Sequence, residues 1–135
     1  MNEWLIGLLA LVALATMMTA AYIWTIRPPV AYNEAGARSG IHYNTINHVV
    51  DVRSQEEWDY GHYSGAYHIP VRQIPAELPR LLHDRSKSLL FYGGVGGDRA
   101  YKAARLAQDL GYNTVGYLEQ GDYKGLEHLN PPTRG

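Results

Sequence analysis

The sequence predicts an open parallel α/β sheet with helices on both faces, preceded by one transmembrane helix. After residue 40, short apolar runs alternate with stretches of helical periodicity, the pattern of parallel strands joined by crossover helices. Before them lies one long run without charge. The 135 residues suffice for one small domain. The predicted organisation is an N-terminal tail (1–3), a transmembrane helix (4–26), a linker (27–40), the α/β domain (41–130) and a C-terminal tail (131–135).

The N-terminal apolar run extends from Trp4 to Ile26 and would form a helix of about 34 Å, enough for a hydrocarbon core of about 30 Å. Trp4 at one end, and Tyr22 and Trp24 at the other, suit the two membrane interfaces. A cleaved signal peptide fits less well, because no Lys or Arg precedes the run and the run is too long. We therefore expect an uncleaved single-pass anchor.

The charges that flank this run predict its orientation. Glu3 is the only charged side chain before it, whereas Arg27 and Arg38 follow it. Positive charge favours the cytoplasmic side, so we expect residues 27–135 in the cytoplasm.

Composition excludes several kinds of chemistry. The chain has no cysteine, which rules out disulfides, thiolate chemistry and cysteine-ligated metals. Its six histidines lack the spacing of a helical metal site, so we expect no metal and no cofactor. A net charge of −1 without a basic stripe argues against a nucleic-acid partner.

The first part of the domain is expected to begin after a linker. The prolines that follow Arg27 stop the apolar helix, and the linker runs to about Gly40. Residues 41–46 alternate weakly and suggest an edge strand. Residues 48–53 form a short apolar run that is typical of a central parallel strand.

A short helix follows this central strand. Ser54 and Glu57 have the spacing of a capping box, and Gly61 would end the helix after Tyr60. The turn over residues 61–70 then leads into a third strand.

The remaining elements continue the alternation. Pro75 is permitted in a first helical turn, whereas Pro79 requires that helix to be short or kinked. The expected elements are a helix within 75–84, a strand at 89–92, a helix at 99–110 ended by Gly111, a strand at 115–118 and a helix at 122–129.

A glycine-rich loop joins the strand at 89–92 to the helix after it. It consists of Gly93, Gly94, Val95, Gly96, Gly97, Asp98 and Arg99. Backbone amides and the positive end of a helix dipole converge in such a loop, which favours an anion. The loop has no Cys, Ser or Thr, so it offers no nucleophile. A plain connection without a ligand is the alternative.

Nucleotide motifs are incomplete in this loop. The Walker pattern is absent, and the dinucleotide fingerprint begins with Gly94 and Gly96 but meets Arg99 in place of its third glycine. Glu119 lies where an acid that binds ribose would sit, at the end of the next strand.

Two blocks of the chain resemble conserved motifs of rhodanese domains. Residues 49–53, Glu57-Trp58 and residues 61–70 resemble the first block, and Leu118-Glu119-Gln120-Gly121 resembles the closing Leu-x-Gly-Gly. The resemblance covers about residues 48–127 and implies a rhodanese-like sheet. A membrane helix ahead of one such domain is a familiar arrangement in bacteria.

The resemblance also gives roles to particular positions. It implies that the motif residues Asp51, Arg53, Gly61, His62 and Gly65 are structural. For His62, a catalytic base is the alternative to a side chain that orders backbone carbonyls.

The family's persulfide-carrying cysteine is missing. Strand register puts Gly93 at its position, whereas counting back from Arg99 puts Gly94 there. With Gly93 as the start, the loop is one residue longer than in sulfurtransferases and resembles that of rhodanese-fold dual-specificity phosphatases. The closing block departs at Gln120 and at Leu126, near the usual tryptophan.

We therefore expect a membrane-anchored, catalytically inactive rhodanese-like domain that binds or tethers a protein. Eleven tyrosines suit a contact surface, because they give large area at low entropic cost. One alternative is an anion-binding domain, related to sulfurtransferases or phosphatases, that uses a partner's cysteine. Another is an accessory structural subunit of a larger membrane complex. Weak binding of an oxyanion, opposed by Asp98 beside Arg99, is also expected.

Overall fold

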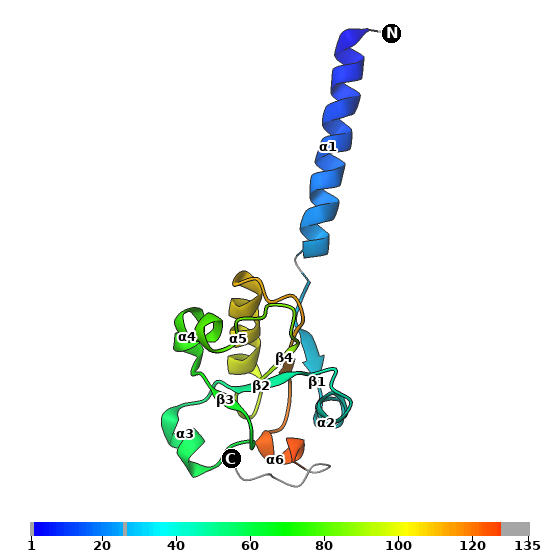
Figure 1. Ribbon diagram of the computed structural model, residues 1–135. Helices are drawn as coiled ribbons and strands as arrows, with labels where there is room; N and C mark the ends of the chain where they lie inside the picture. The colour runs from blue at the N-terminus through cyan, green and yellow to red at the C-terminus, as the bar shows by residue number, and fades with distance from the viewer. Residues whose placement is uncertain (1, 26, 128–135) are drawn as a thin grey trace.

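A computed structural model describes residues 2–25 and 27–127 (Figure 1). Its elements are α1 (Glu3–Thr25), β1 (Val30–Tyr32), α2 (Glu34–His42), β2 (His48–Asp51), α3 (Gln55–Tyr60), β3 (Tyr67–His68), a 3-10 helix (Val71–Gln73), α4 (Ile74–Leu81), β4 (Leu89–Tyr92), α5 (Asp98–Asp109), β5 (Val115–Leu118) and α6 (Tyr123–Leu126).

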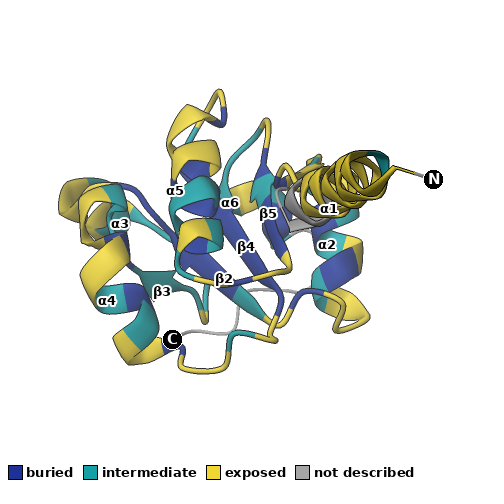
Figure 2. Ribbon diagram, turned by 90° about the horizontal axis from the view of Figure 1, so that it is seen from above, coloured by how far each residue is buried: buried dark blue, intermediate teal, exposed yellow. Residues whose placement is uncertain are grey.

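The five strands form one parallel sheet in the order β1-β5-β4-β2-β3. Successive side chains of β2 and β4 enter different hydrophobic clusters, because neighbouring residues of a strand point to opposite faces. Helices α4 and α5 cover one face, and α2 and α6 cover the other. Figure 2 shows the buried residues along the sheet and the exposed outer sides of these helices. The predicted fold class is confirmed.

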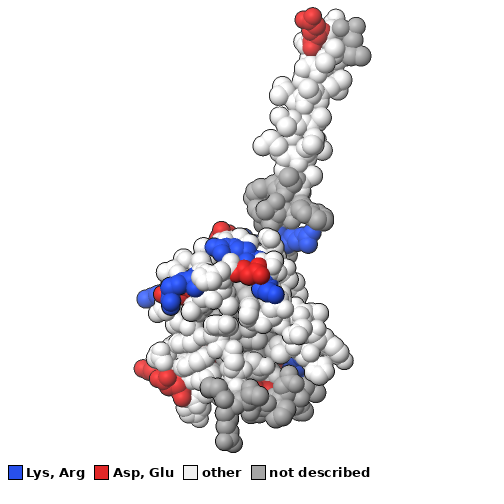
Figure 3. All heavy atoms as spheres, viewed as in Figure 1, with Lys and Arg blue, Asp and Glu red and all other residues white. Residues whose placement is uncertain are grey.

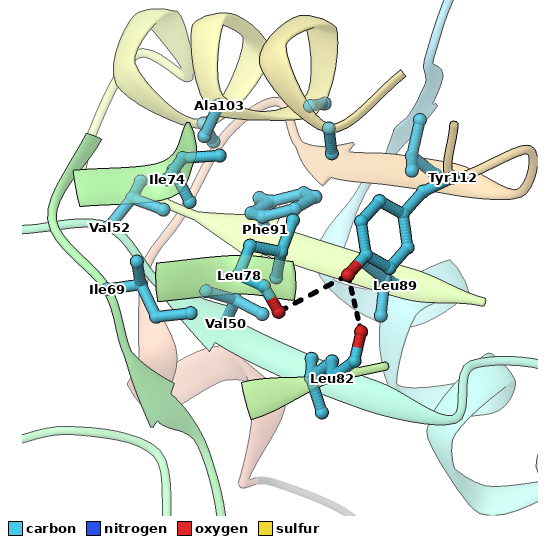
Figure 4. Packing of buried hydrophobic residues seen from close by; sticks show 14 residues of the cluster. Val50, Val52, Ile69, Ile74, Leu78, Leu82, Leu89, Phe91, Ala103 and Tyr112 are labelled. Atoms are coloured by element: carbon cyan, nitrogen blue, oxygen red, sulfur yellow. Dashed lines mark hydrogen bonds between the residues drawn. The ribbon is translucent and has the colours of Figure 1, made fainter. Parts of the chain in front are cut away.

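The larger cluster lies between the sheet and helices α4 and α5 (Figure 4). Phe91 is fully buried there beside Leu78 and Ala103. Tyr112 lies between α5 and β5, and its hydroxyl donates to the carbonyl oxygens of Leu78 and Leu82. The bonds satisfy the one polar group that this aromatic side chain brings into the core.

The predicted linker over residues 27–40 is wrong. It contains β1 and most of α2, and the edge strand expected at 41–46 is the end of α2 and the turn after it. β1 pairs with β5, and the ring of Tyr32 packs over Gly116 so closely that a Cβ atom at Gly116 would clash with Cε2 of Tyr32. The α/β fold therefore begins at Val30 and not at residue 41.

Most other elements lie close to their predicted ranges. The capping box of Ser54 and Glu57 is formed, and α3 ends at Tyr60 as expected. Helix α4 is short, with Pro79 inside it, and Gly111 follows α5 at a φ of 98°. α6 ends at Leu126, before the predicted residue 129. Residues 128–135, which include the end of the predicted domain and its tail, lie outside the described residues.

Helix α1 is long and apolar enough to cross a membrane. Its window Glu3–Ala20 has a mean hydropathy of 1.8 and no part of it is buried against the domain. Membrane anchors and N-terminal signal sequences share these properties of length and composition. Ile26, the predicted last residue of the span, lies outside the described residues.

Candidate functional site

The carboxyl ends of β2, β4 and β5 bring three connecting segments together at one edge of the sheet. β2 leads into α3, β4 leads through residues 93–97 into α5, and β5 leads through residues 119–122 into α6. Ligands of open parallel sheets bind beyond this edge. The predicted glycine loop thus lies at the centre of the candidate site.

Gly93 and Gly94, the two alternative positions predicted for the family's cysteine, both have close neighbours. A Cβ atom at Gly93 would lie 2.9 Å from the backbone nitrogen of Ala100 and 2.9 Å from Cβ of Arg99. Gly94 has a φ of 93°, and its Cβ would lie 2.8 Å from Nη2 of Arg99. A side chain at either position therefore requires the loop or Arg99 to move.

Few backbone amides of the loop have a partner within the domain. Val95 and Gly96 form a turn, and none of the described residues accepts a hydrogen bond from the amides of residues 94–96. Helix α5 starts directly afterwards, so its positive end faces the same place. The loop has the backbone of an anion cradle without a nucleophile.

Arg99 forms an ion pair with Glu57 of α3 across this loop. Its Nη1 lies 2.6 Å from Oε1, and its Nη2 lies 2.9 Å from Oε2. The hydrogen bonds from Arg99, with smaller contributions from Ser54, lower the pKa of Glu57 to about 2. The same pair raises the pKa of Arg99. The carboxylate that pairs with Arg99 is therefore Glu57, which the sequence did not single out as its partner.

A buried ion pair of Asp51 and Arg53 lies beneath the loops. Nη2 of Arg53 is 2.7 Å from Oδ2 of Asp51 and also donates to the carbonyl oxygen of Gly61 at 2.7 Å. Burial alone would lower the pKa of Arg53, but its hydrogen bonds with Asp51 raise it. These three motif residues therefore tie the end of β2 to the end of α3.

Two tyrosine rings flank the buried guanidinium. The Cζ atom of Arg53 lies 5.4 Å from the ring centre of Tyr92 and 5.0 Å from that of Tyr123. The hydroxyl of Tyr92 accepts a hydrogen bond from the amide of Tyr63 at 3.0 Å. Burial, and then the charge of Asp51, raise the pKa of Tyr92. This phenol therefore stays neutral at physiological pH.

Two histidines stack on the indole ring of Trp58. The ring centres of His62 and Trp58 lie 3.4 Å apart, and the two ring planes differ by only 3°. Nδ1 of His62 is 2.9 Å from the carbonyl oxygen of Trp58. His68 stacks on the same indole at 4.7 Å and contacts the carbonyl oxygen of Arg53 at 2.8 Å. Both imidazoles thus contact backbone carbonyls, and Gly65 turns the chain between them at a φ of 83°. The sequence did not single out Trp58 as the shared partner.

An open pocket of about 370 Å³ lies between α3 and α6. Its lining residues are Arg53, Glu56, Glu57, Tyr60, Asp122, Tyr123 and Lys124. Tyr60 is 89% exposed, so its ring is free to contact another molecule. The pocket borders the glycine loop through Glu57, while Glu119, the predicted ribose ligand, is not among its lining residues.

Comparison with known proteins places these features in one family. The sequence model for the rhodanese-like domain matches residues 37–126. A tRNA uridine(34) hydroxylase of Yersinia enterocolitica is 32% identical over 76 residues, which are 53% of this chain and 21% of the relative. The chain thus spans about a fifth of the length of the curated relatives it matches.

Two solved structures show the same fold. The human single-domain sulfurtransferase TSTD1 is 28% identical, with a TM-score of 0.57, over 80% of this chain and all of the other. A rhodanese from E. coli, solved with anions, is 24% identical, with a TM-score of 0.54, over 65% of this chain and 98% of the other.

Proposed function

Because this chain belongs to the rhodanese-like domain family, which is related to sulfurtransferases, we propose that it is a catalytically inactive member. In this proposal α1 anchors the domain in a membrane, and the carboxyl edge of the sheet binds another protein. The domain then acts as a tether and not as an enzyme.

The absence of cysteine from the whole sequence is the observation that carries this proposal. Persulfide chemistry needs a thiolate, and no other side chain can replace it. The resemblance puts either Gly93 or Gly94 at the position of the nucleophile. A side chain at Gly93 would meet the backbone nitrogen of Ala100, whereas one at Gly94 would displace the end of the Arg99 side chain.

The pocket between α3 and α6 is the proposed contact surface for the partner. Tyr60 and Tyr123 offer aromatic area, and Glu56, Asp122 and Lys124 offer both signs of charge around it. Aromatic residues surrounded by polar groups are typical of protein interfaces. The expected partner is a polar segment of another protein.

Affinity purification of the full chain in mild detergent tests this surface. Tyr60→Ala should lower recovery of the partner about tenfold, which corresponds to about 1.4 kcal/mol. Tyr43→Ala is the matched control, because Tyr43 is 73% exposed but lies beyond the end of α2, away from the pocket. Equal losses from both variants would contradict the proposed surface. Recovery that depends on α1 alone would instead indicate a structural subunit held by its anchor.

The proposed orientation places the domain in the cytoplasm. Arg27 is exposed just after α1, and the only charged residue before the apolar run is Glu3. A reporter fused after Gly135 should give a cytoplasmic signal. Transferring the charge, by Asn2→Arg together with Arg27→Gln, should weaken or reverse the orientation. Arg38 is unsuitable for this test, because it also bonds the carbonyl oxygen of Gly125.

The amides of residues 94–96, which have no acceptor among the described residues, favour a second function. With Arg99, they suit an oxyanion or a group carried on a partner's cysteine. Binding of thiosulfate that strengthens in the presence of the purified partner would support this function. Affinity that is the same with and without the partner would contradict it.

A further inference from the structure

The two ends of the sheet differ in charge. Because every strand pair is parallel, all amino ends lie at one edge and all carboxyl ends at the other. In Figure 3, most of the blue lies at the end of the domain next to α1, and red lies over α3 at the opposite end. The charges are thus arranged along the strand direction, although the whole chain carries only −1.

Basic side chains prevail at the amino edge. Arg27 precedes β1, Arg85 and Lys87 precede β4, and Arg105 lies in the second half of α5. Two carboxylates, Asp84 and Asp109, lie among them, while Arg80 is already paired with Glu77.

Acidic side chains prevail at the carboxyl edge. The acidic residues there are Glu34, Asp51, Glu56, Glu57, Asp59, Asp98, Glu119, Asp122 and Glu127. The bases there are fewer, namely Arg38, Arg53, Arg72, Arg99 and Lys124, and ion pairs hold Arg53 and Arg99. Negative charge therefore remains at this edge.

Chain continuity holds the amino edge close to α1. Helix α1 ends at Thr25 and β1 begins at Val30, so the five Cα–Cα steps between them limit the distance between these two residues to about 17 Å. The side-chain amide of Gln108 also donates to the carbonyl oxygen of Arg27, which fixes the connection to α5.

We infer that the basic end formed by Arg27, Arg85, Lys87 and Arg105 lies against anionic lipid headgroups. The inference rests on the proposed anchoring of α1. Anionic lipids attract basic groups near the surface and repel the acidic edge, so both edges favour one orientation. The pocket and the glycine loop then face away from the membrane, toward a soluble partner.

The variants that test this surface must spare the fold. Arg85 is unsuitable, because its Nε donates to the carbonyl oxygen of Leu110 and its guanidinium lies over the ring of Tyr112.

Lys87 is exposed and has no ion pair within residues 2–25 and 27–127. Arg105 makes one long hydrogen bond, of 3.3 Å, to Gln108. Lys87→Gln with Arg105→Gln is therefore the test. Arg72→Gln is the control, because Arg72 is exposed after β3 at the opposite edge and does not line the pocket.

The experiment uses the full chain in nanodiscs of phosphatidylcholine alone or of equal parts phosphatidylcholine and phosphatidylglycerol. A paramagnetic label on the lipid headgroups broadens the backbone amide signals of residues close to the membrane. We expect broadening at residues 83–88 and 111–114 in the anionic discs, and none at residues 94–97. The double variant should lower the equilibrium constant for docking roughly tenfold, whereas the control should leave it unchanged.

The outcomes separate this inference from the anchor itself. A chain that enters nanodiscs but shows the same broadening at both edges, or in both lipid mixtures, overturns the docking surface and leaves the anchor in place. An equal loss of docking in the control variant also overturns it. A chain that does not enter nanodiscs contradicts the anchor, and the docking surface with it.

Discussion

Arg53 and Arg99 follow two neighbouring strands and pair with carboxylates in different environments. Arg53 and Asp51 are buried, with 8% and 0% of their side chains exposed, whereas Arg99 and Glu57 are 44% and 39% exposed. Removing one partner of a buried pair leaves an uncompensated charge, while an exposed pair is screened by water. The first pair therefore maintains the fold, and the second positions a side chain beside the loop.

Asp51→Asn should lower the free energy of unfolding by about 3–5 kcal/mol, because Arg53 keeps a buried charge without its counterion. Urea unfolding of the full chain in detergent, followed by near-UV circular dichroism, measures this change. Glu77→Gln, in the exposed pair with Arg80, is the control and should cost less than about 1 kcal/mol. Similar costs for both variants would show that burial does not distinguish the pairs.

The ion pair of Glu57 with Arg99 should make the stability of the domain fall in acid. The pKa of Glu57 falls from 4.5 to about 2 on folding, so its contribution is present above pH 4.5 and lost as pH falls toward 2. The contribution should stay below about 1 kcal/mol, because both partners are more than a third exposed. Thermal unfolding of wild type and Glu57→Gln should differ near neutral pH and converge in acid. A difference that persists at pH 2 would contradict this role.

The glycine loop should bind a small oxyanion weakly. Converging amides and the dipole of α5 each contribute only about 0.3–1 kcal/mol near the surface, so we expect an affinity no better than about millimolar, or −4 kcal/mol. Titration with sulfate, phosphate or thiosulfate should move the NMR amide signals of residues 93–100.

Variants of charged neighbours sharpen this prediction. Asp98→Asn should strengthen binding by removing an opposing charge, and Glu57→Gln should release Arg99 from its partner. Arg99→Ala should abolish binding. Silent amides in wild type and in Asp98→Asn would show that the loop is only a turn.

At the scale of elements, the sequence predicted the helices and strands whose signals lie in neighbouring residues. The Ser54 capping box and the buried runs of β2, β4 and β5 could be read from neighbouring residues. β1 could not, because its three residues are mostly exposed and its partner strand is more than eighty residues away. Helix α2 contains Gly36 and Gly40, poor helix formers that tertiary packing stabilises.

The site shows the same limit. The sequence predicted the loop, because its glycines come directly after a buried strand. The buried ion pair of Asp51 and Arg53 joins two residues of one sequence motif. The partnership of Arg99 with Glu57 spans 42 residues, and the pocket joins α3 to α6. No local pattern links such distant segments, so only the folded sheet shows them together.

A chain that begins at residue 41 should lose cooperative unfolding, whereas one that begins at Arg27 should keep it. The shorter chain lacks β1, which covers one edge of β5, and Ala37, which is fully buried in the second cluster. Urea unfolding of the two shortened chains compares them directly. Equal cooperativity would show that β1 and α2 are dispensable.

At the scale of the whole molecule, the charge arrangement and the missing nucleophile support one account. Helix α1, the proposed anchor, lies at the amino edge of the sheet, and the loop and pocket lie at the carboxyl edge. Such a molecule would present a rhodanese-like surface at a fixed distance from the membrane. We propose that this edge binds a partner and does not transfer sulfur.

A sulfurtransferase assay of the purified full chain tests the central claim most directly. With thiosulfate and cyanide, we predict no thiocyanate above a buffer blank, because the chain has no thiol to carry sulfur. Gly93→Cys and Gly94→Cys, examined by mass spectrometry for one added sulfur atom, provide the matched comparison and identify the family's cysteine position. Turnover by the wild-type chain, with no other protein present, would contradict the account.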